Sequence, residues 1–478
     1  MKSQIEPVLN FIDGRFVGAR DGRVASILNP ATGIQLTTAA ESAPQDVDDA
    51  VSAARNAFET WRNATPGERS SVLLKLADAM EKDTDELALL ESMDAGKPLQ
   101  PLKQFEMPII IDTLRFNAAA ARCLEAPAPG EYTTGMTSFV RKEPVGVVGQ
   151  VAPWNYPLLM AVMKIAPALA AGNTVVLKPA PTTPISASRL AALAADIVPK
   201  GVLNIVNGGN STGQALVGHA GVDMVSLTGS TETGRVIARS AAESLKRVHL
   251  ELGGKAPVIV FADADVKAAL DTIAMAAFYN AGQDCTAATR IIAESSIYDT
   301  VIEGLAERAR ALVLGDPLDG ATTLGPLNSE AQRDRVAGFI ARRPTNVQLR
   351  CGGRAAPRPG YFFEPTVLVG LEQNDELIQR EIFGPVVTVQ SFRGEAEALR
   401  LANGTQYGLG SSVWTRDLAT ALRVSGRISA GTVWINTHNV LVTEMPFGGF
   451  KKSGYGRDFG VQSIEEYTQT KHVLVNLA

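Results

Sequence analysis

Apolar residues recur at helical spacing in two segments near the start of the chain, residues 46–61 and 70–93. Between these segments the run Thr65-Pro66-Gly67-Glu68 is a start signal for the second helix. We therefore expect the first quarter of the chain to be largely helical.

A different pattern begins at Gly146, where short apolar runs alternate with helical stretches. The expected strands are residues 147–151, 174–177, 203–206, 224–227 and 247–250. Strands separated by helices predict a parallel sheet with helical crossovers. One helical stretch, residues 158–171, is apolar, but Lys164 and Pro167 interrupt it and it is too short to span a bilayer. We expect it to be a helix buried in protein.

The same alternation starts again after Gly253-Gly254, with residues 257–261 as the first strand of a second unit. The pattern therefore predicts an α/β fold with its main boundary at these glycines. Two outlying strands, residues 137–141 and 471–475, alternate apolar and polar residues and lie far apart in the sequence. The alternative is that they are two ordinary edge strands.

Composition narrows the function classes without choosing among them. The chain has 478 residues, of which 45% are hydrophobic, and a formal net charge of −5 with Lys and Arg scattered along it. Its length implies two or three domains, and no basic cluster indicates a nucleic-acid partner.

The cysteines and histidines are few and scattered. Three cysteines without metal-ligand spacing and four dispersed histidines argue against a disulfide framework and against a zinc site. The first seven residues lack the apolar core of a signal peptide. We expect a cytoplasmic protein with no metal, no nucleic-acid partner and no membrane association.

One cysteine has surroundings that suit a nucleophile. Cys285 follows a Gly-Gln turn, and Ala287 and Ala288 leave room around its sulfur. A free cysteine has a pKa near ~8.5, so it needs a base to become a thiolate. Glu251, 34 positions upstream in the run Glu-Leu-Gly-Gly-Lys, could accept that proton if the fold brings the two together. A small packing cysteine and a surface glutamate remain the alternative.

A phosphate site is indicated at a strand–helix junction, although no Gly-x-Gly-x-x-Gly follows the first strand. The run from Gly229 to Gly234 comes after the strand that ends at Leu227, so a helix start there would offer N–H groups, and Ser230 a hydroxyl, to a pyrophosphate. By itself Ser230 could also be an ordinary helix cap. Lys178 follows another strand and precedes Pro179, which places its ammonium at the carboxyl edge of the sheet.

Six motifs in a fixed order connect these features. They are Pro153-Trp154-Asn155-Tyr156-Pro157, Leu177-Lys178-Pro179-Ala180, Leu227-Thr228-Gly229-Ser230, the Glu251 run, the Cys285 run and Glu381-Ile382-Phe383-Gly384-Pro385-Val386. Together they resemble the aldehyde dehydrogenase superfamily, from about residues 11–14 to residues 446–454.

The resemblance implies an aldehyde dehydrogenase-like architecture. It comprises a Rossmann-type cofactor domain (residues 1–122 and 142–253), a second α/β catalytic domain (254–454) and a small β arm that joins subunits (123–141 and 465–478), with residues 455–464 connecting them. A homotetramer or homodimer is expected.

The resemblance also assigns catalytic roles. Cys285 would attack an aldehyde to give a thiohemiacetal, and Asn155 would donate to its oxyanion together with the Cys285 N–H. Such donors contribute ~2.7–4 kcal/mol each. Glu251 would activate the water that releases a free acid from the thioester. Relatives that transfer the acyl group to coenzyme A usually lack this glutamate.

For the cofactor, the resemblance implies NAD. Lys178 would bind the adenosine ribose, Glu381 the nicotinamide ribose, and Phe383 would lie beside it. The remaining residues expected at the cofactor are Trp154, Gly229, Ser230, Gly234 and Leu252. Pro181 stands where NAD-preferring members often carry a glutamate, which removes a charge that would repel a 2′-phosphate, so NADP remains the alternative.

The substrate resemblance is to 4-aminobutanal dehydrogenases, within the aminoaldehyde and betaine aldehyde group, and it is carried by residues 279–285, 434–438 and 452–456. The substrate residues expected are Glu106, Tyr156, Met163, Tyr279, Asp284 and Thr286. Anions and aromatic faces would suit an ammonium group. Two departures are Met163, where many relatives have tryptophan, and Ile109, where plant enzymes have a second acid.

Three alternatives remain open. A succinic semialdehyde dehydrogenase would want an arginine near Cys285, and Arg290 is five residues beyond it. A broad-specificity aldehyde dehydrogenase is the second. A catalytically inactive scaffold is the third, although such a protein should have lost Cys285, Glu251 or Asn155.

Overall fold

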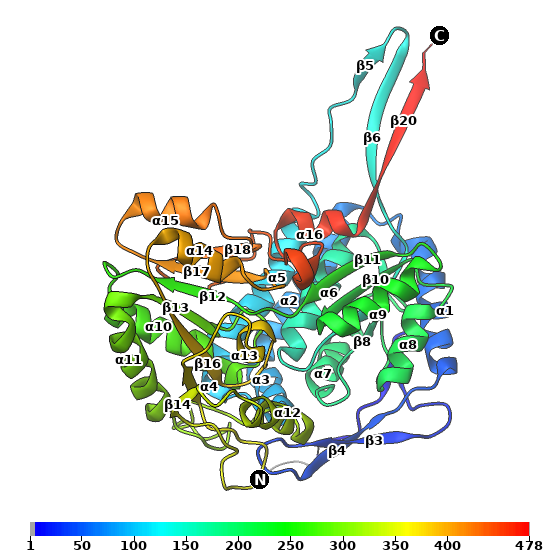
Figure 1. The fold of residues 1–478 in the computed structure, drawn as a ribbon. Coiled ribbons are helices and arrows are strands. Elements are labelled where there is room, and N and C mark those ends of the chain that lie inside the picture. The colour runs from blue at the N-terminus through cyan, green and yellow to red at the C-terminus, as the bar shows by residue number, and fades with distance from the viewer. Residues whose placement is uncertain (1–4, 478) are drawn as a thin grey trace.

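The computed structural model describes residues 5–477, which form two α/β units and a projecting β arm (Figure 1). The first unit contains an eight-stranded sheet and the second a seven-stranded sheet. The sheets are separate, and the chain passes from one to the other between Leu252 and Pro257. This passage lies at the Gly253-Gly254 boundary expected from the sequence.

The chain opens with strands rather than helices, so the expectation of a largely helical first quarter is wrong for its first part. The four strands are Asn10–Ile12 (β1), Arg15–Val17 (β2), Val24–Leu28 (β3) and Gln35–Ala40 (β4). β1 and β2 extend the first sheet, while β3 and β4 pair with each other. β2 is fully exposed and β3 mostly so, and strands this short and exposed carry little hydrophobic pattern.

Helices follow, and one of them differs from expectation. The expected helix over residues 46–61 is Pro44–Trp61 (α1). The helix expected over residues 70–93 is wrong as a single element, because it is divided into Pro66–Lys82 (α2) and Thr84–Ala95 (α3). Asp83 lies between them, and its carboxylate accepts two hydrogen bonds, of 2.5 and 2.6 Å, from the Arg189 guanidinium. A short irregular stretch, Leu99–Pro101 (α4) and Leu102–Glu106 (η1), leads to Met107–Ala120 (α5).

The first sheet confirms the five expected parallel strands to within two residues at each end. They are Val147–Val151 (β7), Thr174–Lys178 (β8), Leu203–Ile205 (β9), Met224–Gly229 (β10) and Arg247–Leu252 (β11). Their spatial order is β9-β8-β7-β10-β11. β1 and β2 flank them antiparallel at one side, and Gly454–Tyr455 (β19) pairs antiparallel with β11 at the other.

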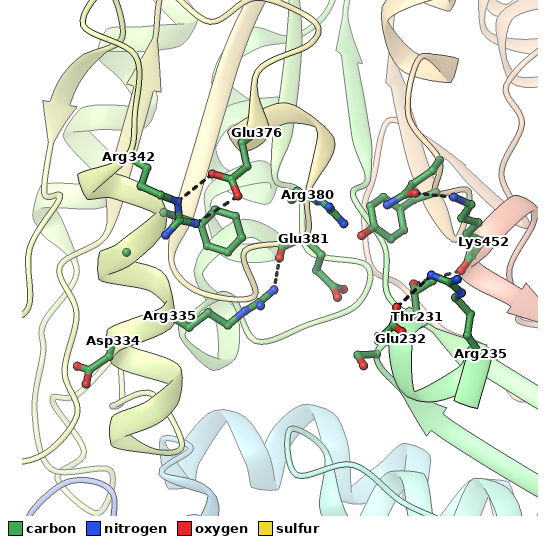
Figure 2. A pocket seen from close by; sticks show the side chains of 15 residues that line it. Thr231, Glu232, Arg235, Asp334, Arg335, Arg342, Glu376, Arg380, Glu381 and Lys452 are labelled. Atoms are coloured by element: carbon green, nitrogen blue, oxygen red, sulfur yellow. Dashed lines mark hydrogen bonds and ion pairs between the residues drawn. The ribbon is translucent and has the colours of Figure 1, made fainter. Parts of the chain in front are cut away.

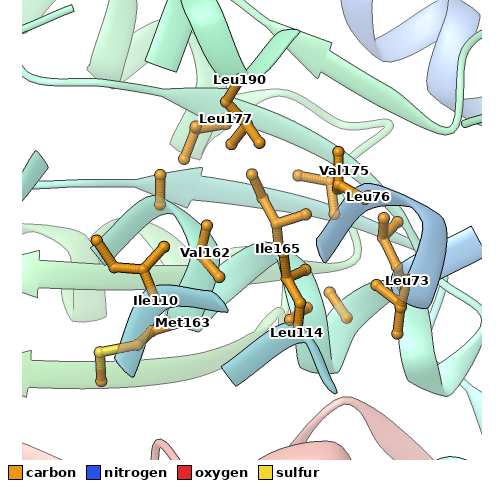
Figure 3. Close-up of a cluster of buried hydrophobic side chains, with 14 of the residues drawn as sticks. Leu73, Leu76, Ile110, Leu114, Val162, Met163, Ile165, Val175, Leu177 and Leu190 are labelled. Atoms are coloured by element: carbon orange, nitrogen blue, oxygen red, sulfur yellow. The ribbon is translucent and has the colours of Figure 1, made fainter. Parts of the chain in front are cut away.

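Helices cover this sheet. They include Pro157–Ala171 (α6), Ile185–Ala194 (α7), Asn210–Gly218 (α8) and Thr231–Ala242 (α9). Every residue of α6 is buried, as expected for the apolar stretch 158–171. Figure 3 shows Val162 and Ile165 of this helix between Leu177 of β8 and Leu114 of α5, within the largest core cluster. Among the described residues, no helix has the length and apolar character needed to cross a bilayer.

The second sheet begins with the strand expected at residues 257–261. Its strands are Pro257–Val260 (β12), Arg290–Glu294 (β13), Gln348–Cys351 (β14), Thr366–Val369 (β15), Val386–Phe392 (β16), Gly410–Trp414 (β17) and Thr432–Ile435 (β18). All are parallel except β14. The accompanying helices are Val266–Phe278 (α10), Tyr298–Ala311 (α11), Glu330–Ala341 (α12), Glu376–Gln379 (α13), Glu395–Asn403 (α14) and Leu418–Ser425 (α15).

The two outlying strands pair with each other. Met136–Pro144 (β6) and Thr468–Asn476 (β20) form nine antiparallel residue pairs, and Gly130–Thr133 (β5) adds a third strand. The three strands project from the body of the molecule, and the helix Gly460–Glu466 (α16) lies at their base (Figure 1). The sheet order therefore excludes the alternative that these strands are edges of the two large sheets.

Candidate active site

The cavity that contains Cys285 lies where the strand order of the first sheet reverses, between β7 and β10. From β7 the chain proceeds to β8 and β9 on one side and then to β10 and β11 on the other. Loops that leave two such neighbouring strands diverge and open a crevice at the carboxyl ends, which is where ligands bind in open parallel sheets. The cavity measures about 290 Å³.

Segments from both units line this cavity. The lining residues come from the loop after β7, from α6, from the carboxyl ends of β10 and β11 and the residues that follow them, from the loop that carries Cys285, from α12 and from the loop after α13: Pro153, Trp154, Asn155, Tyr156, Met160, Thr228, Gly229, Ser230, Glu251, Leu252, Gly253, Cys285, Gln332, Arg335, Glu381 and Phe383. The three residues expected to be catalytic, Cys285, Glu251 and Asn155, are thus brought together.

Cys285 lies in the loop between α10 and β13. Asn280, Ala281 and Gly282 precede it with left-handed backbone angles, φ of 50°, 53° and 69°. Three such residues in succession turn the chain sharply, so that the thiol is partly exposed to the cavity while its neighbours are buried. Burial raises the pKa of the Cys285 thiol well above its usual value, and the negative charges of nearby carboxylates add to this effect.

Glu251 lies on β11 and is 3% exposed. Burial raises the pKa of its carboxyl well above the usual range, and Asp458 raises it further, while Lys164 opposes the shift. His249, two residues earlier on the same face of β11, places its ring with Glu251 and Asp458 so that one ligand-type atom of each lies within 4.8 Å of the others. A carboxyl with a raised pKa is a stronger base, which suits the role expected for Glu251.

Gly253 and Gly254, which follow Glu251 and Leu252, allow two other loops to approach the backbone closely. A Cβ on Gly253 would lie 2.3 Å from a carboxylate oxygen of Glu381, and a Cβ on Gly254 would lie 2.0 Å from the Cys285 carbonyl oxygen. The Gly254 N–H donates to Glu381 at 2.9 Å. Thus the Glu251 run is the surface on which the nucleophile loop and the Glu381 loop both pack.

Asn155 and Asp284 form hydrogen bonds that connect the segments next to Cys285. The Asn155 amide uses one of its two N–H donors on the Gln283 carbonyl, at 3.0 Å, so the other can serve an oxyanion in the cavity. The Asp284 carboxylate accepts from the Tyr156 hydroxyl at 2.7 Å, from the Thr286 N–H at 2.7 Å and from the Asn439 amide at 2.8 Å. Asp284 is thereby tied to the protein, and neither it nor Thr286 lines the cavity.

Six of the nine residues expected at the cofactor line the cavity: Trp154, Gly229, Ser230, Leu252, Glu381 and Phe383. The Ser230 hydroxyl caps α9 by accepting the Thr233 N–H at 3.2 Å, so the cap and the phosphate interpretations place it at the same helix start. The Trp154 and Phe383 rings meet edge to face with centroids 5.3 Å apart. Burial raises the pKa of Glu381 to about 7. A helix start facing carboxyl and aromatic groups fits a dinucleotide.

The other three lie outside the cavity. Lys178 and Pro181 are at the next sheet edge, where Pro181 lines a separate small cavity with Glu41. Gly234 is in the first turns of α9, and a Cβ there would lie 2.6 Å from the Leu252 side chain. A glycine at this position therefore permits close packing of α9 on the sheet.

Glu106 and Tyr279, expected to contact substrate, do not line the cavity; Glu106 is buried and Tyr279 is partly buried. The Tyr279 hydroxyl donates to Glu106 at 2.6 Å, and the Lys97 ammonium forms a close ion pair with the same carboxylate. Lys97 also lies 3.9 Å from the centre of the Tyr156 ring. Burial raises the pKa of Glu106 to about 7, with Lys97 opposing the shift.

Met163 is 2% exposed and packs beside Ile110 in the core (Figure 3). Met160, almost one helical turn earlier, faces the cavity instead. Arg290, considered as an anchor for a carboxylate substrate, is fully buried and donates to the Lys255, Leu401 and Ala402 carbonyls. It therefore does not face the cavity.

Sequence reasoning missed Gln332 and Arg335 on α12. They are three residues apart on one helix face, and the signal was only this spacing within a polar helix. Gln332 donates to the Phe383 carbonyl at 2.6 Å, and Arg335 donates to the Glu381 carbonyl at 2.6 Å. Figure 2 shows Arg335 directed at Glu381 in an adjoining cleft of about 460 Å³.

The arrangement supports acyl chemistry. A thiol, a buried carboxyl base and an amide donor share one cavity with a helix N-terminus and an aromatic pair. The first three groups suit covalent attack on a carbonyl, and the last two suit a nucleotide.

The aldehyde dehydrogenase family model matches residues 16–473. An aldehyde dehydrogenase of Emericella nidulans is 44% identical over 98% of this chain and 95% of its own, and a phenylacetaldehyde dehydrogenase of Pseudomonas fluorescens is 43% identical over 97% and 95%. A betaine aldehyde dehydrogenase of Staphylococcus aureus, solved with NAD⁺, superimposes with a TM-score of 0.96 at 37% identity, covering 98% of this chain and 94% of its own. The chain belongs to the aldehyde dehydrogenase family.

Proposed function

We propose that this protein oxidises an aldehyde to the free carboxylic acid with NAD, and that its preferred aldehyde carries a cationic group, as 4-aminobutanal does. The observation that carries the reaction is the shared cavity of Cys285, Glu251 and Asn155. NAD, when bound, accepts the hydride. Ser230 and the start of α9 would hold its pyrophosphate, and Glu381 its nicotinamide ribose.

The chain's own residues supply the remaining chemistry. The Cys285 thiol loses its proton to Glu251, directly or through water, and the sulfur attacks the carbonyl carbon. The second Asn155 N–H and the Cys285 backbone N–H stabilise the resulting oxyanion. After hydride loss an acyl thioester remains. Glu251 releases the thiol proton to solvent, then takes a proton from the water that attacks the thioester carbonyl, and returns this proton to the departing Cys285 thiolate, which frees the acid and the thiol.

The preference for a cation is supported by buried charge next to the nucleophile. Glu91 and Glu106 both pair with the Lys97 ammonium, and a third carboxylate, that of Asp284, directly precedes Cys285. The Tyr156 hydroxyl donates to Asp284, the Tyr279 hydroxyl donates to Glu106, and aromatic faces also attract cations. The excess of carboxyls makes this region negative, provided that Glu106 is ionised.

The experiment compares 4-aminobutanal with butanal, an uncharged aldehyde of the same chain length. The ratio of kcat/KM values should favour 4-aminobutanal and should rise as pH increases through about 7, where Glu106 ionises. Glu106→Gln should lower the ratio about fivefold or more and remove its pH dependence. Glu131→Gln, a change of the same charge in the arm, is the matched control. A ratio near one that Glu106→Gln leaves unchanged would contradict the cationic substrate and leave aldehyde oxidation standing.

A second candidate is an uncharged aldehyde. Glu106 is paired with Lys97, and Asp284 accepts three or more hydrogen bonds, so both carboxylates already have protein partners. A preference for butanal or phenylacetaldehyde in the same assay would support it. Succinic semialdehyde is disfavoured because Arg290 is turned away from the cavity.

We also propose a cytoplasmic homotetramer or homodimer. Cys123, Cys285 and Cys351 are free thiols, which supports a reducing compartment. The arm exposes large apolar side chains, including Tyr132 and Leu474, which supports its role in joining subunits.

A further inference from the structure

An anion-binding position is built at the sheet edge beyond Pro181. The Lys178 ammonium, on a side chain that is 5% exposed, donates to the Pro179 carbonyl at 3.0 Å and to the Gly208 carbonyl at 2.9 Å. Burial lowers the pKa of Lys178 to about 8, and the charge of Glu41 opposes that shift. A fixed, desolvated ammonium of this kind attracts an anion strongly.

A carboxylate of the protein, that of Glu41, lies near this ammonium. Glu41 follows β4, and its Oε1 accepts the Gly209 N–H at 3.0 Å, immediately before α8. The start of α8 carries partial positive charge, which adds to that of Lys178. The carboxylate of Glu41 therefore lies where two separate elements both favour a negative charge.

Glu41 is also a neighbour of Pro181. The two residues line the same small cavity with Ala180 and Gly208, and its volume of about 10 Å³ has room for a water-sized group. Pro181 carries no charge, and Glu41, 140 positions earlier in the chain, thus supplies a negative charge near it.

We propose that Glu41 makes this protein select NAD over NADP. The inference rests on the proposed function, because it takes Lys178 as the partner of the adenosine ribose. A ribose 2′-hydroxyl can donate to the Glu41 carboxylate. A 2′-phosphate beside Lys178 would be repelled by the Glu41 carboxylate at close range, and it would compete with Glu41 for the Gly209 N–H at the start of α8.

The test measures nucleotide binding without any aldehyde. Isothermal titration of the purified full chain would compare 5′-AMP with adenosine 2′,5′-bisphosphate, which differ by the 2′-phosphate alone. The wild-type protein should bind 5′-AMP more tightly. Glu41→Gln keeps a hydrogen-bond acceptor for Gly209 but removes the charge, so it should improve binding of the bisphosphate about tenfold or more while changing 5′-AMP less than about threefold. Glu41→Lys should invert the preference.

Glu59→Gln, on the exposed face of α1, is the control for net charge. Thermal unfolding of each variant would show that it is folded, and Glu41→Asp, which retains the charge, should retain the wild-type preference. An unchanged ratio of the two affinities in Glu41→Gln, or wild-type protein that prefers the bisphosphate, would overturn the proposal. Failure of aldehyde oxidation with normal 5′-AMP binding would refute the proposed reaction and not the role of Glu41.

Discussion

Burial affects the pKa of the proposed nucleophile, Cys285, and of the proposed base, Glu251, in the same direction. Burial raises the pKa of both Cys285 and Glu251, so the uncharged forms of both are favoured in the closed cavity. Once Glu251 has lost its proton to solvent, its carboxylate is a strong base that can take the thiol proton when the substrate arrives. This arrangement also limits unwanted reaction of a permanent thiolate.

Cys285→Ala should reduce aldehyde oxidation by at least roughly 1000-fold, because no other thiol lines the cavity formed by the described residues. Binding of NADH, followed by its fluorescence, should stay within about threefold of wild type, since the sulfur does not hold the nucleotide. Substantial remaining turnover would refute the nucleophile assignment. Cys123→Ala, an exposed cysteine, is the control.

Glu251→Gln separates the two half-reactions. If Glu251 is needed to activate water, rapid mixing should show an initial burst of NADH and then a much slower steady rate while the thioester accumulates. Mass spectrometry of the quenched protein should find the acyl group on Cys285. Steady turnover at the wild-type rate, without a burst, would exclude Glu251 as the required base.

Glu381 should make stability depend on pH. Its pKa is about 7 in the folded protein against 4.5 ordinarily, so the folded state holds an extra proton between these values. The contribution is fully present below about pH 4.5 and is lost as pH rises through 7, a change of about 3 kcal/mol. The Tm of wild type relative to Glu381→Gln should therefore fall across this window in thermal scans. Parallel curves would contradict the raised pKa.

At the scale of elements, the sequence pattern predicted those strands and helices whose position depends on residues within the segment itself. The buried strands β7 to β11 are continuous apolar runs between helices, so they could be placed within two residues of their observed ends. The division at Asp83 could not be predicted, because its partner Arg189 is 106 residues away. In the same way, six motifs indicated the residues of the cavity, but the pairing of Glu106 with Lys97 depends on a turn of irregular helix between them.

The contact between α9 and β11 gives a prediction for a glycine. Gly234→Ala would place a Cβ 2.6 Å from Leu252, so the helix must shift away from the strand that carries Glu251. We expect a destabilisation of about 1–3 kcal/mol and weaker NADH binding. Gly218→Ala is the matched control, because it lies at the end of α8 with nothing within 4 Å of the added methyl group. Equal Tm values for the two variants would contradict this packing argument.

At the scale of the whole molecule, the β arm exposes large apolar side chains to solvent in the single chain. Its exposed apolar residues include Leu474, which is 51% exposed, and Leu477, which is 64% exposed. The sequence predicted two of its strands from their alternation. It could not establish that they pair, because they are separated by more than 300 residues.

Leu474→Asp should dissociate the proposed oligomer, since it would place a charge without a partner on the apolar surface of the arm. Light scattering after size-exclusion chromatography should show a smaller species than wild type. Thr470→Asp, which adds the same charge at another exposed position of β20, should have less effect. An unchanged mass for Leu474→Asp would place the subunit interface elsewhere.

The end of the chain closes its first sheet. β19 pairs with β11 beside Glu251, the Tyr467 carbonyl accepts the Asn173 amide at 2.9 Å, and the Tyr467 hydroxyl donates to Ser226 on β10 at 3.0 Å. During synthesis these contacts can form only after residues 454–467 have been made, long after β10 and β11. The first sheet therefore keeps an unpaired edge along β11, beside Glu251, until this late segment folds against it.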